Sequence, residues 1–122
     1  MVNVICDTNF LIHLATKKIK NLDHIEEDIG TISFLVPNVV YNELLNLKNN
    51  IKKKIHIEQT LEYIQKFEKI CINGNFADKE ILDYIKNDRC FVGTMDFEFK
   101  KNIKKLGSYV ISFHNDKMVL ES

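Results

Sequence analysis

The N-terminal residues combine a short apolar run with an acid that ends it. Residues 2–6 (VNVIC) are rich in β-branched side chains, and the run stops at Asp7. A short apolar run bounded by polar residues is typical of a buried strand in a parallel sheet. Ligands of α/β proteins gather where such strands end. We therefore expect Asp7 at a ligand-binding edge, although an acid there also caps a following helix.

The remaining pattern predicts alternating strands and helices. Apolar residues spaced by three or four positions indicate helices, and β-branched runs ended by Gly, Pro or Asn indicate strands. Helices are predicted after Asp7, over residues 21–29, after Pro37, over residues 52–69, and in two segments opened by Asp78 and Asp96. Strands are predicted over residues 2–6, 31–36, 69–72, 90–94 and 109–113, with 117–120 as a short edge strand.

This order of elements predicts an α/β fold. Strands separated by helices favour a mainly parallel central sheet with helices on both faces, which is a three-layer α/β/α sandwich. A chain of 122 residues has the length of one domain, and no linker or low-complexity segment divides it. We expect residues 1–122 to form a single domain.

Composition excludes several classes of protein. No apolar run approaches the roughly 18–20 residues of a membrane span, and no signal peptide is evident, so we expect a cytoplasmic protein without membrane contact. Cys6, Cys71 and Cys90 are odd in number and lack C-x-x-C spacing. They are predicted to be reduced core thiols, and a zinc site is not expected.

Four acids occupy matching places in the predicted topology. Asp7 and Asp96 directly follow predicted strands. Glu43 lies in the second turn of the helix after another strand, and Asp78 opens a helix that leaves the same edge. Because parallel strands end at one edge of a sheet, all four side chains are expected to face one crevice. Taken singly, each is equally explained as a helix cap, a first-turn acid or a surface residue.

Clustered carboxylates favour divalent cations. Like charges within a few ångströms drive protonation unless a counter-charge is present. Carboxylate ligands without His or Cys suit Mg²⁺ or Mn²⁺, and a pair of such ions can activate a water and stabilise the leaving oxygen of a phosphodiester. Thr8, Asn9 and Thr94 are short polar residues beside the acids and are expected to orient ligands or bound water. Phosphodiester hydrolysis is the chemistry that this pattern favours.

The balanced overall charge is compatible with a locally basic surface. The 17 basic and 17 acidic residues balance, which by itself argues against a nucleic-acid partner. Setting the four acids aside leaves 13 acidic against 17 basic residues on the rest of the molecule. Phosphate contacts are predicted for four lysines of the helix after Asp96, which are Lys100, Lys101, Lys104 and Lys105. The alternative is an ordinary solvated, lysine-rich helix.

Four ordered motifs resemble those of the PIN-domain nucleases. They are VICDTNFL (residues 4–11), VVYNEL (39–44), ADKEIL (77–82) and VGTMD (92–96), and together they span nearly the whole chain. The resemblance implies a PIN-like fold and metal-dependent hydrolysis of single-stranded or structured RNA. It assigns catalysis and metal binding to Asp7, Glu43, Asp78 and Asp96. Thr94 matches the hydroxyl residue that precedes the last acid.

Within that family, residues 94–105 and 110–113 look most like the PIN nuclease of small-subunit rRNA processing and its short archaeal relatives. A Mg²⁺- or Mn²⁺-dependent endoribonuclease of RNA processing, with a pre-ribosomal partner, is therefore expected. One alternative is a VapC-type toxin with an antitoxin partner, and another is an inactive PIN-like scaffold that binds RNA or protein. Family members commonly form homodimers. Lys79 stands where relatives often carry a second acid, so Glu80 and Glu98 are further candidate ligands.

Overall fold

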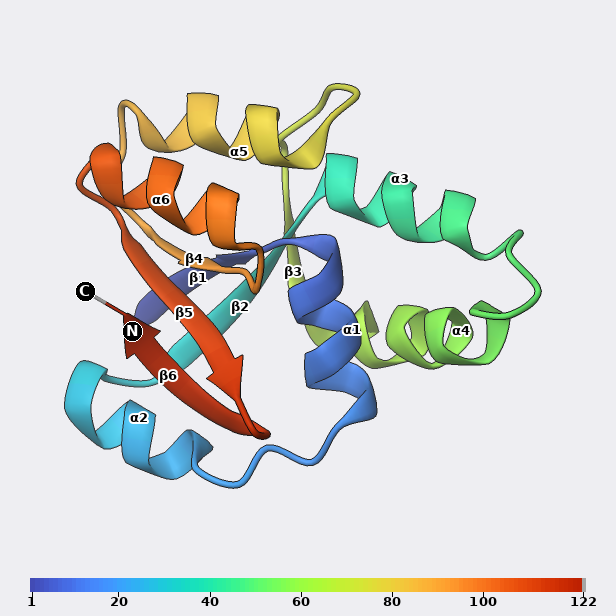
Figure 1. Cartoon of the computed structure of the whole chain (residues 1–122), viewed down its shortest axis with the longest axis horizontal. Helices are drawn as coiled ribbons and strands as arrows, with labels where there is room; N and C mark the ends of the chain where they lie inside the picture. Colours follow the sequence, from blue (N-terminus) through green and yellow to red (C-terminus); the bar gives the residue numbers. More distant parts are fainter. Residues whose placement is uncertain (122) are drawn as a thin grey trace.

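The computed structural model describes residues 1–121. All strands of these residues belong to one sheet (Figure 1). The strand order is β3-β2-β1-β4-β5-β6. Strands β1 to β5 run parallel, and β6 is antiparallel to β5. The strands are β1 (Val2–Cys6), β2 (Ile32–Pro37), β3 (Glu68–Ile70), β4 (Phe91–Gly93), β5 (Tyr109–His114) and β6 (Lys117–Glu121). The predicted α/β class with a mainly parallel sheet is confirmed.

Helices connect the parallel strands. They are α1 (Thr8–Thr16), α2 (Leu22–Ile29), α3 (Asn38–Leu47), α4 (Lys54–Tyr63), the 3₁₀ turn η1 (Ile64–Lys66), α5 (Ala77–Ile85) and α6 (Phe97–Lys105). Figure 1 shows α3 beside α4 and α5 beside α6, and each of these pairs is in contact. The helices α1, α3, α5 and α6 all begin where a parallel strand ends or near that edge, so their first turns meet there.

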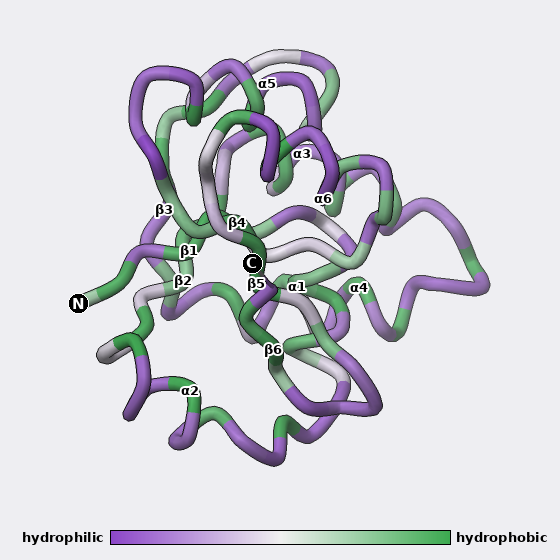
Figure 2. Tube along the Cα trace, turned by 60° about the vertical axis from the view of Figure 1, so that its left-hand side comes forward, coloured by the Kyte–Doolittle hydropathy of each residue, from purple (hydrophilic) through white to green (hydrophobic). Residues whose placement is uncertain are grey.

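The core lies along the central strands. Ile5, Val92 and Ile111 are almost completely buried, and Figure 2 shows the strands as the hydrophobic centre of the chain. Phe10 of α1 packs on this layer and is fully buried. A β-carbon at Gly93 would lie only 2.8 Å from the Phe10 ring, so a glycine is required where α1 crosses the end of β4. The core therefore fixes the start of α1 against the end of β4.

The predicted helix over residues 52–69 is too long. The α-helix ends at Tyr63, a 3₁₀ turn follows, and β3 begins at Glu68 instead of residue 69. Ile64 is buried, and Phe67 packs on Phe34 with the ring centroids 5.4 Å apart. Apolar spacing thus continues through the turn, because periodicity reports burial and not the backbone conformation that buries the side chain.

The C-terminal strand closes one edge of the sheet. The predicted strand 117–120 extends to Glu121 and pairs with β5 across a tight turn in which Asn115 and Asp116 have positive φ. On the other edge of β6, the Asn21 side chain donates to the Met118 carbonyl and accepts from its N–H, at 2.9 and 2.7 Å. These contacts cover part of an otherwise open strand edge.

The cysteines differ from the prediction of three core thiols. Cys6 is buried as expected, but Cys90 is only partly buried and Cys71 is exposed, because β3 ends at Ile70 and Cys71 lies beyond the sheet. All three are free. No helix within residues 1–121 has the length and apolar character needed to cross a membrane.

Candidate active site

A pocket of about 210 Å³ lies where the strand order reverses. Strand β1 stands between β2 and β4, so the chain leaves β1 in one direction and returns on its other side, which is where α/β sheets open a crevice. The four predicted acids all line this acid pocket. Its full lining is Asp7, Thr8, Asn9, Glu43, Ala77, Asp78, Asp96 and Phe99.

Two of these acids also cap helices. Asp7 Oδ1 accepts from the Phe10 N–H at the start of α1, and Asp96 Oδ1 accepts from the Phe99 N–H at the start of α6, each at 2.9 Å. One carboxylate oxygen is used in each cap. Capping and a role in the pocket are therefore compatible, since the cap itself holds each carboxylate at the pocket wall.

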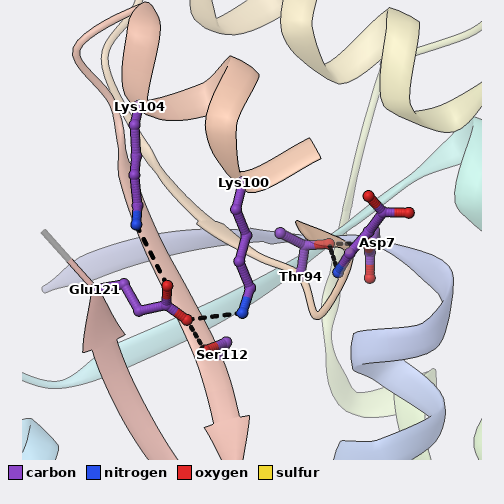
Figure 3. Close-up of polar contacts among 7 residues, drawn as sticks. Asp7, Thr94, Lys100, Lys104, Ser112 and Glu121 are labelled. Carbon is purple, nitrogen blue, oxygen red and sulfur yellow. Dashed lines mark hydrogen bonds and ion pairs between the residues drawn. The ribbon is translucent and has the colours of Figure 1, made fainter. Parts of the chain in front are cut away.

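Thr94 joins the two caps from beneath the pocket. Its buried hydroxyl donates to Asp7 Oδ2, and its oxygen accepts from the Asp96 N–H at 3.2 Å. Figure 3 shows the Thr94 side chain beside Asp7. The Thr94 hydroxyl acts as donor to one acid and as acceptor from the backbone of the other, so the distance between the two acids depends on this residue.

Glu43 reaches the same place from α3. One carboxylate oxygen accepts from the Thr8 hydroxyl at 2.6 Å, and the other accepts from the Ala77 N–H at 3.2 Å. Glu43 thus ties the start of α1 to the start of α5. Asp78 is more exposed, and its Oδ1 accepts from the neighbouring Lys79 N–H at 2.9 Å.

The electrostatics of the pocket disfavour a fully ionised cluster. Burial is the largest cause that raises the pKa of Asp7, and the carboxylates of Asp96 and Glu43 raise it further. Hydrogen bonds from Thr94 and from the Phe10 N–H lower it in part, and the resulting pKa is about 6. A positive charge among these three acids would remove the conflict.

The donor set suits a hard, hydrated cation. Within residues 1–121, no three His, Cys, Asp or Glu side chains are arranged as a complete metal-ligand group. The ionisable side chains of the pocket are all carboxylates. Mg²⁺ usually retains several waters and binds one or two carboxylates directly, so it does not require a closed cage, in contrast to structural zinc.

The remaining predicted residues divide into two groups. Thr8 and Asn9 line the pocket, whereas Glu80 and Glu98 do not belong to its lining. The sequence reasoning missed Phe99, which forms a wall, and the Ala77 N–H, which holds Glu43. A backbone N–H group cannot be recognised from the residue type that carries it. Ala77 directly precedes Asp78, however, so the predicted start of that helix was the available signal.

Two of the four predicted RNA-binding lysines are engaged within the fold. Lys100 and Lys104 lie 2.8 and 3.3 Å from carboxylate oxygens of Glu121, and Ser112 donates to the same carboxylate (Figure 3). Burial opposes ionisation of Glu121, but the two lysines and Ser112 outweigh it and lower its pKa to about 2. These lysines stabilise the attachment of β6 to α6.

The other two lysines have different surroundings. Lys101 lies 3.7 Å from Glu98, with its ammonium over the Phe97 ring at 4.7 Å. Lys105 lines a second hollow, between α5 and α6, which shares Asp78 with the acid pocket. The four lysines of α6 therefore do not form one basic face.

Comparisons with known proteins show the family and the fold of this chain. The family described as "PIN like domain" matches residues 4–116, which include all four acids. Ribonuclease VapC4 of Methanocaldococcus jannaschii is 31% identical over 110 residues, covering 84% of this chain and 83% of that relative. The solved structure of the PIN domain endonuclease Utp24 is similar with a TM-score of 0.75 and 26% identity, over 98% of this chain and 90% of that one.

Proposed function

The chain belongs to the PIN-like domain family, and from this premise we propose that it is a Mg²⁺- or Mn²⁺-dependent endoribonuclease. The observation that carries the proposal is the convergence of four carboxylates from separate elements on one pocket at the switch point of the sheet. The raised pKa of Asp7 supports it, because the ionisable side chains that line the pocket are all carboxylates and a divalent cation would offset their charge.

In this proposal Asp7, Glu43, Asp78 and Asp96 hold the metal. A bound divalent ion would supply an activated water and would offset charge that develops on the phosphodiester. The chain's own hydrogen bonds set the ligand positions. Thr94 fixes Asp7 relative to Asp96, and Thr8 with the Ala77 N–H fixes Glu43. The Asn9 side chain lines the same pocket and is available to a metal-bound water or a substrate oxygen.

Two cellular roles fit the same chemistry. Similarity to the PIN domain endonuclease Utp24 favours RNA processing with a pre-ribosomal partner, and similarity to ribonuclease VapC4 favours a toxin with an antitoxin partner. Growth arrest on expression, relieved by the product of an adjacent gene, would select the toxin role. Accumulation of unprocessed rRNA after depletion would select the processing role.

Cleavage of a panel of structured and unstructured RNAs tests the enzyme proposal. Wild type should cleave with Mg²⁺ or Mn²⁺ and not with EDTA, and Asp7→Asn and Asp96→Asn should abolish cleavage. Asp23→Asn is a suitable control, because Asp23 is an exposed acid of α2 outside the pocket lining. Cleavage that survives both pocket substitutions would place the active site elsewhere. No cleavage and no metal-induced rise in melting temperature would favour the inactive scaffold.

A further inference from the structure

A groove runs away from the acid pocket between α5 and α6. It has a volume of about 390 Å³ and shares Asp78 with the acid pocket. Both helices begin at the pocket and lie side by side along their length (Figure 1). The α5–α6 groove is therefore a direct continuation of the candidate active site.

The groove combines an apolar floor with a rim of three lysines and two aspartates, one of which is the Asp78 that it shares with the acid pocket. Leu82 and Leu106 are partly buried and form apolar surface, while the exposed Lys79, Lys105 and Asn102 add polar groups. A further lysine and aspartate of the lining, Lys86 and Asp83, are paired with each other at 3.1 Å. An apolar surface edged by ammonium groups suits a nucleotide, whose base is flat and apolar on its faces and whose phosphate is anionic.

A smaller hollow of about 190 Å³ adjoins the acid pocket on its other side. It lies between α1 and the start of α4 and shares Asn9 with the acid pocket. Lys53 and His56 are its basic or titratable groups, and Ile12 and Ile57 its apolar ones. An endonuclease must hold its substrate on both sides of the scissile bond, and these two hollows adjoin the acid pocket at different residues, Asp78 and Asn9.

We propose that the RNA strand crosses the acid pocket from the α1–α4 hollow to the α5–α6 groove. This rests on the proposed function. Lys79 and Lys105 bind phosphates along the groove, Asn102 bonds to a base or sugar, and Lys53 binds a phosphate on the other side. These residues, rather than Lys100 and Lys104, are the chain's phosphate contacts near the acids, because the ammonium groups of Lys100 and Lys104 are already paired with the Glu121 carboxylate.

Binding of a fluorescent oligouridylate in EDTA tests the path without requiring catalysis. The affinity is measured between about 50 and 200 mM salt, because each phosphate contact on a single strand contributes about 0.7 to the logarithmic salt slope. Lys79→Gln with Lys105→Gln should weaken binding several-fold and reduce the slope by roughly 1.4, and Lys53→Gln should reduce it by about a further 0.7. Asn102→Ala should weaken binding with the slope unchanged.

Lys18→Gln is the matched control. Lys18 is an exposed lysine of the segment between α1 and α2, which Figure 1 shows at the opposite end of the molecule from α5. The affinity and salt slope of this variant should equal those of wild type. Circular dichroism confirms that each variant is folded. Unchanged salt slopes in the lysine variants of the groove and the hollow, or an equal change in Lys18→Gln, would overturn the path.

Cleavage separates failure of the path from failure of the proposed function. If wild type cleaves RNA with metal while Lys79→Gln/Lys105→Gln keeps the wild-type KM and salt slope, the nuclease proposal stands and the path is wrong. A raised KM with kcat retained supports the path. If wild type does not cleave, the nuclease proposal fails, and the salt slopes alone decide whether this surface binds RNA.

Discussion

Asp7→Asn should stabilise the metal-free protein at neutral pH, although the residue caps a helix. The pKa of Asp7 rises from the ordinary 3.8 to about 6, chiefly through burial and then through Asp96 and Glu43. A rise of this size means that ionised Asp7 lowers the free energy of unfolding by about 3 kcal/mol. An amide has a similar shape and does not carry this charge.

The sign of the pH dependence follows from the raised pKa. Below 3.8 the carboxyl is protonated in both the folded and the unfolded state, so it has no electrostatic cost. Above about 6 it is ionised in both states and the full cost is present. The contribution of Asp7 to stability therefore falls as the pH rises between these two values.

The amide also loses one interaction. The side chain introduced by Asp7→Asn would keep an acceptor for the Phe10 N–H but would present an NH₂ group where Asp7 accepts the Thr94 hydroxyl, at a cost of about 1 kcal/mol. The expected net change in unfolding free energy is a gain of about 2 kcal/mol near pH 7.5 and a slight loss near pH 4.

Urea denaturation in EDTA at both pH values measures this difference. Comparing wild type with the variant at each pH cancels the titration of the carboxylates that lie outside the acid pocket. Added Mg²⁺ should then stabilise wild type and leave the variant unchanged. A variant that is less stable than wild type by the same amount at both pH values would show that Asp7 carries no electrostatic strain, and the case for a cation among these acids would fall.

Three further predictions concern residues that hold the site and the sheet in place. Glu121→Gln should lower the free energy of unfolding at neutral pH by about 2 kcal/mol, which allows for the partial exposure of the carboxylate. Because the folded pKa of Glu121 is about 2, urea midpoints of wild type measured across pH should show this stabilisation above pH 4.5 and its loss as the pH falls toward 2. Gly93→Ala should lower the free energy of unfolding in urea by about 1–3 kcal/mol, because the added methyl group would lie 2.8 Å from the Phe10 ring. An unchanged urea midpoint would show that the ring can move aside without cost. Thr94→Val removes a bond that lowers the pKa of Asp7 and should weaken metal affinity by roughly 10-fold or more in calorimetric titration; unaltered affinity would exclude an orienting role.

The acids could be predicted from the sequence because local rules place them. Asp7 and Asp96 directly follow apolar strands, and parallel strands end at one edge, so their convergence needs no knowledge of side-chain contacts. The same rules predicted the order of the elements and the parallel sheet. What they left open was that Asp7 uses one carboxylate oxygen for its cap and the other to accept the Thr94 hydroxyl.

The lysines could not be predicted in the same way. Lys100 and Lys104 share a face of α6 at helical spacing, which suggests a free basic surface, but their partner Glu121 belongs to a strand 21 and 17 residues further along. Conversely, Lys79 and Lys105 lie far apart in sequence and come together only because α5 and α6 run side by side. Pairings across elements depend on the tertiary fold, and no local pattern records them.

Cleavage of one RNA and of its 2′-deoxy counterpart at the scissile nucleotide tests the central claim most directly. If the carboxylates of the acid pocket act with a divalent ion to direct a water at the phosphodiester, both substrates are cut, the new ends carry linear phosphates, and EDTA stops the reaction. Loss of cleavage on the 2′-deoxy substrate, cyclic phosphate ends, or activity that persists in EDTA would contradict the account.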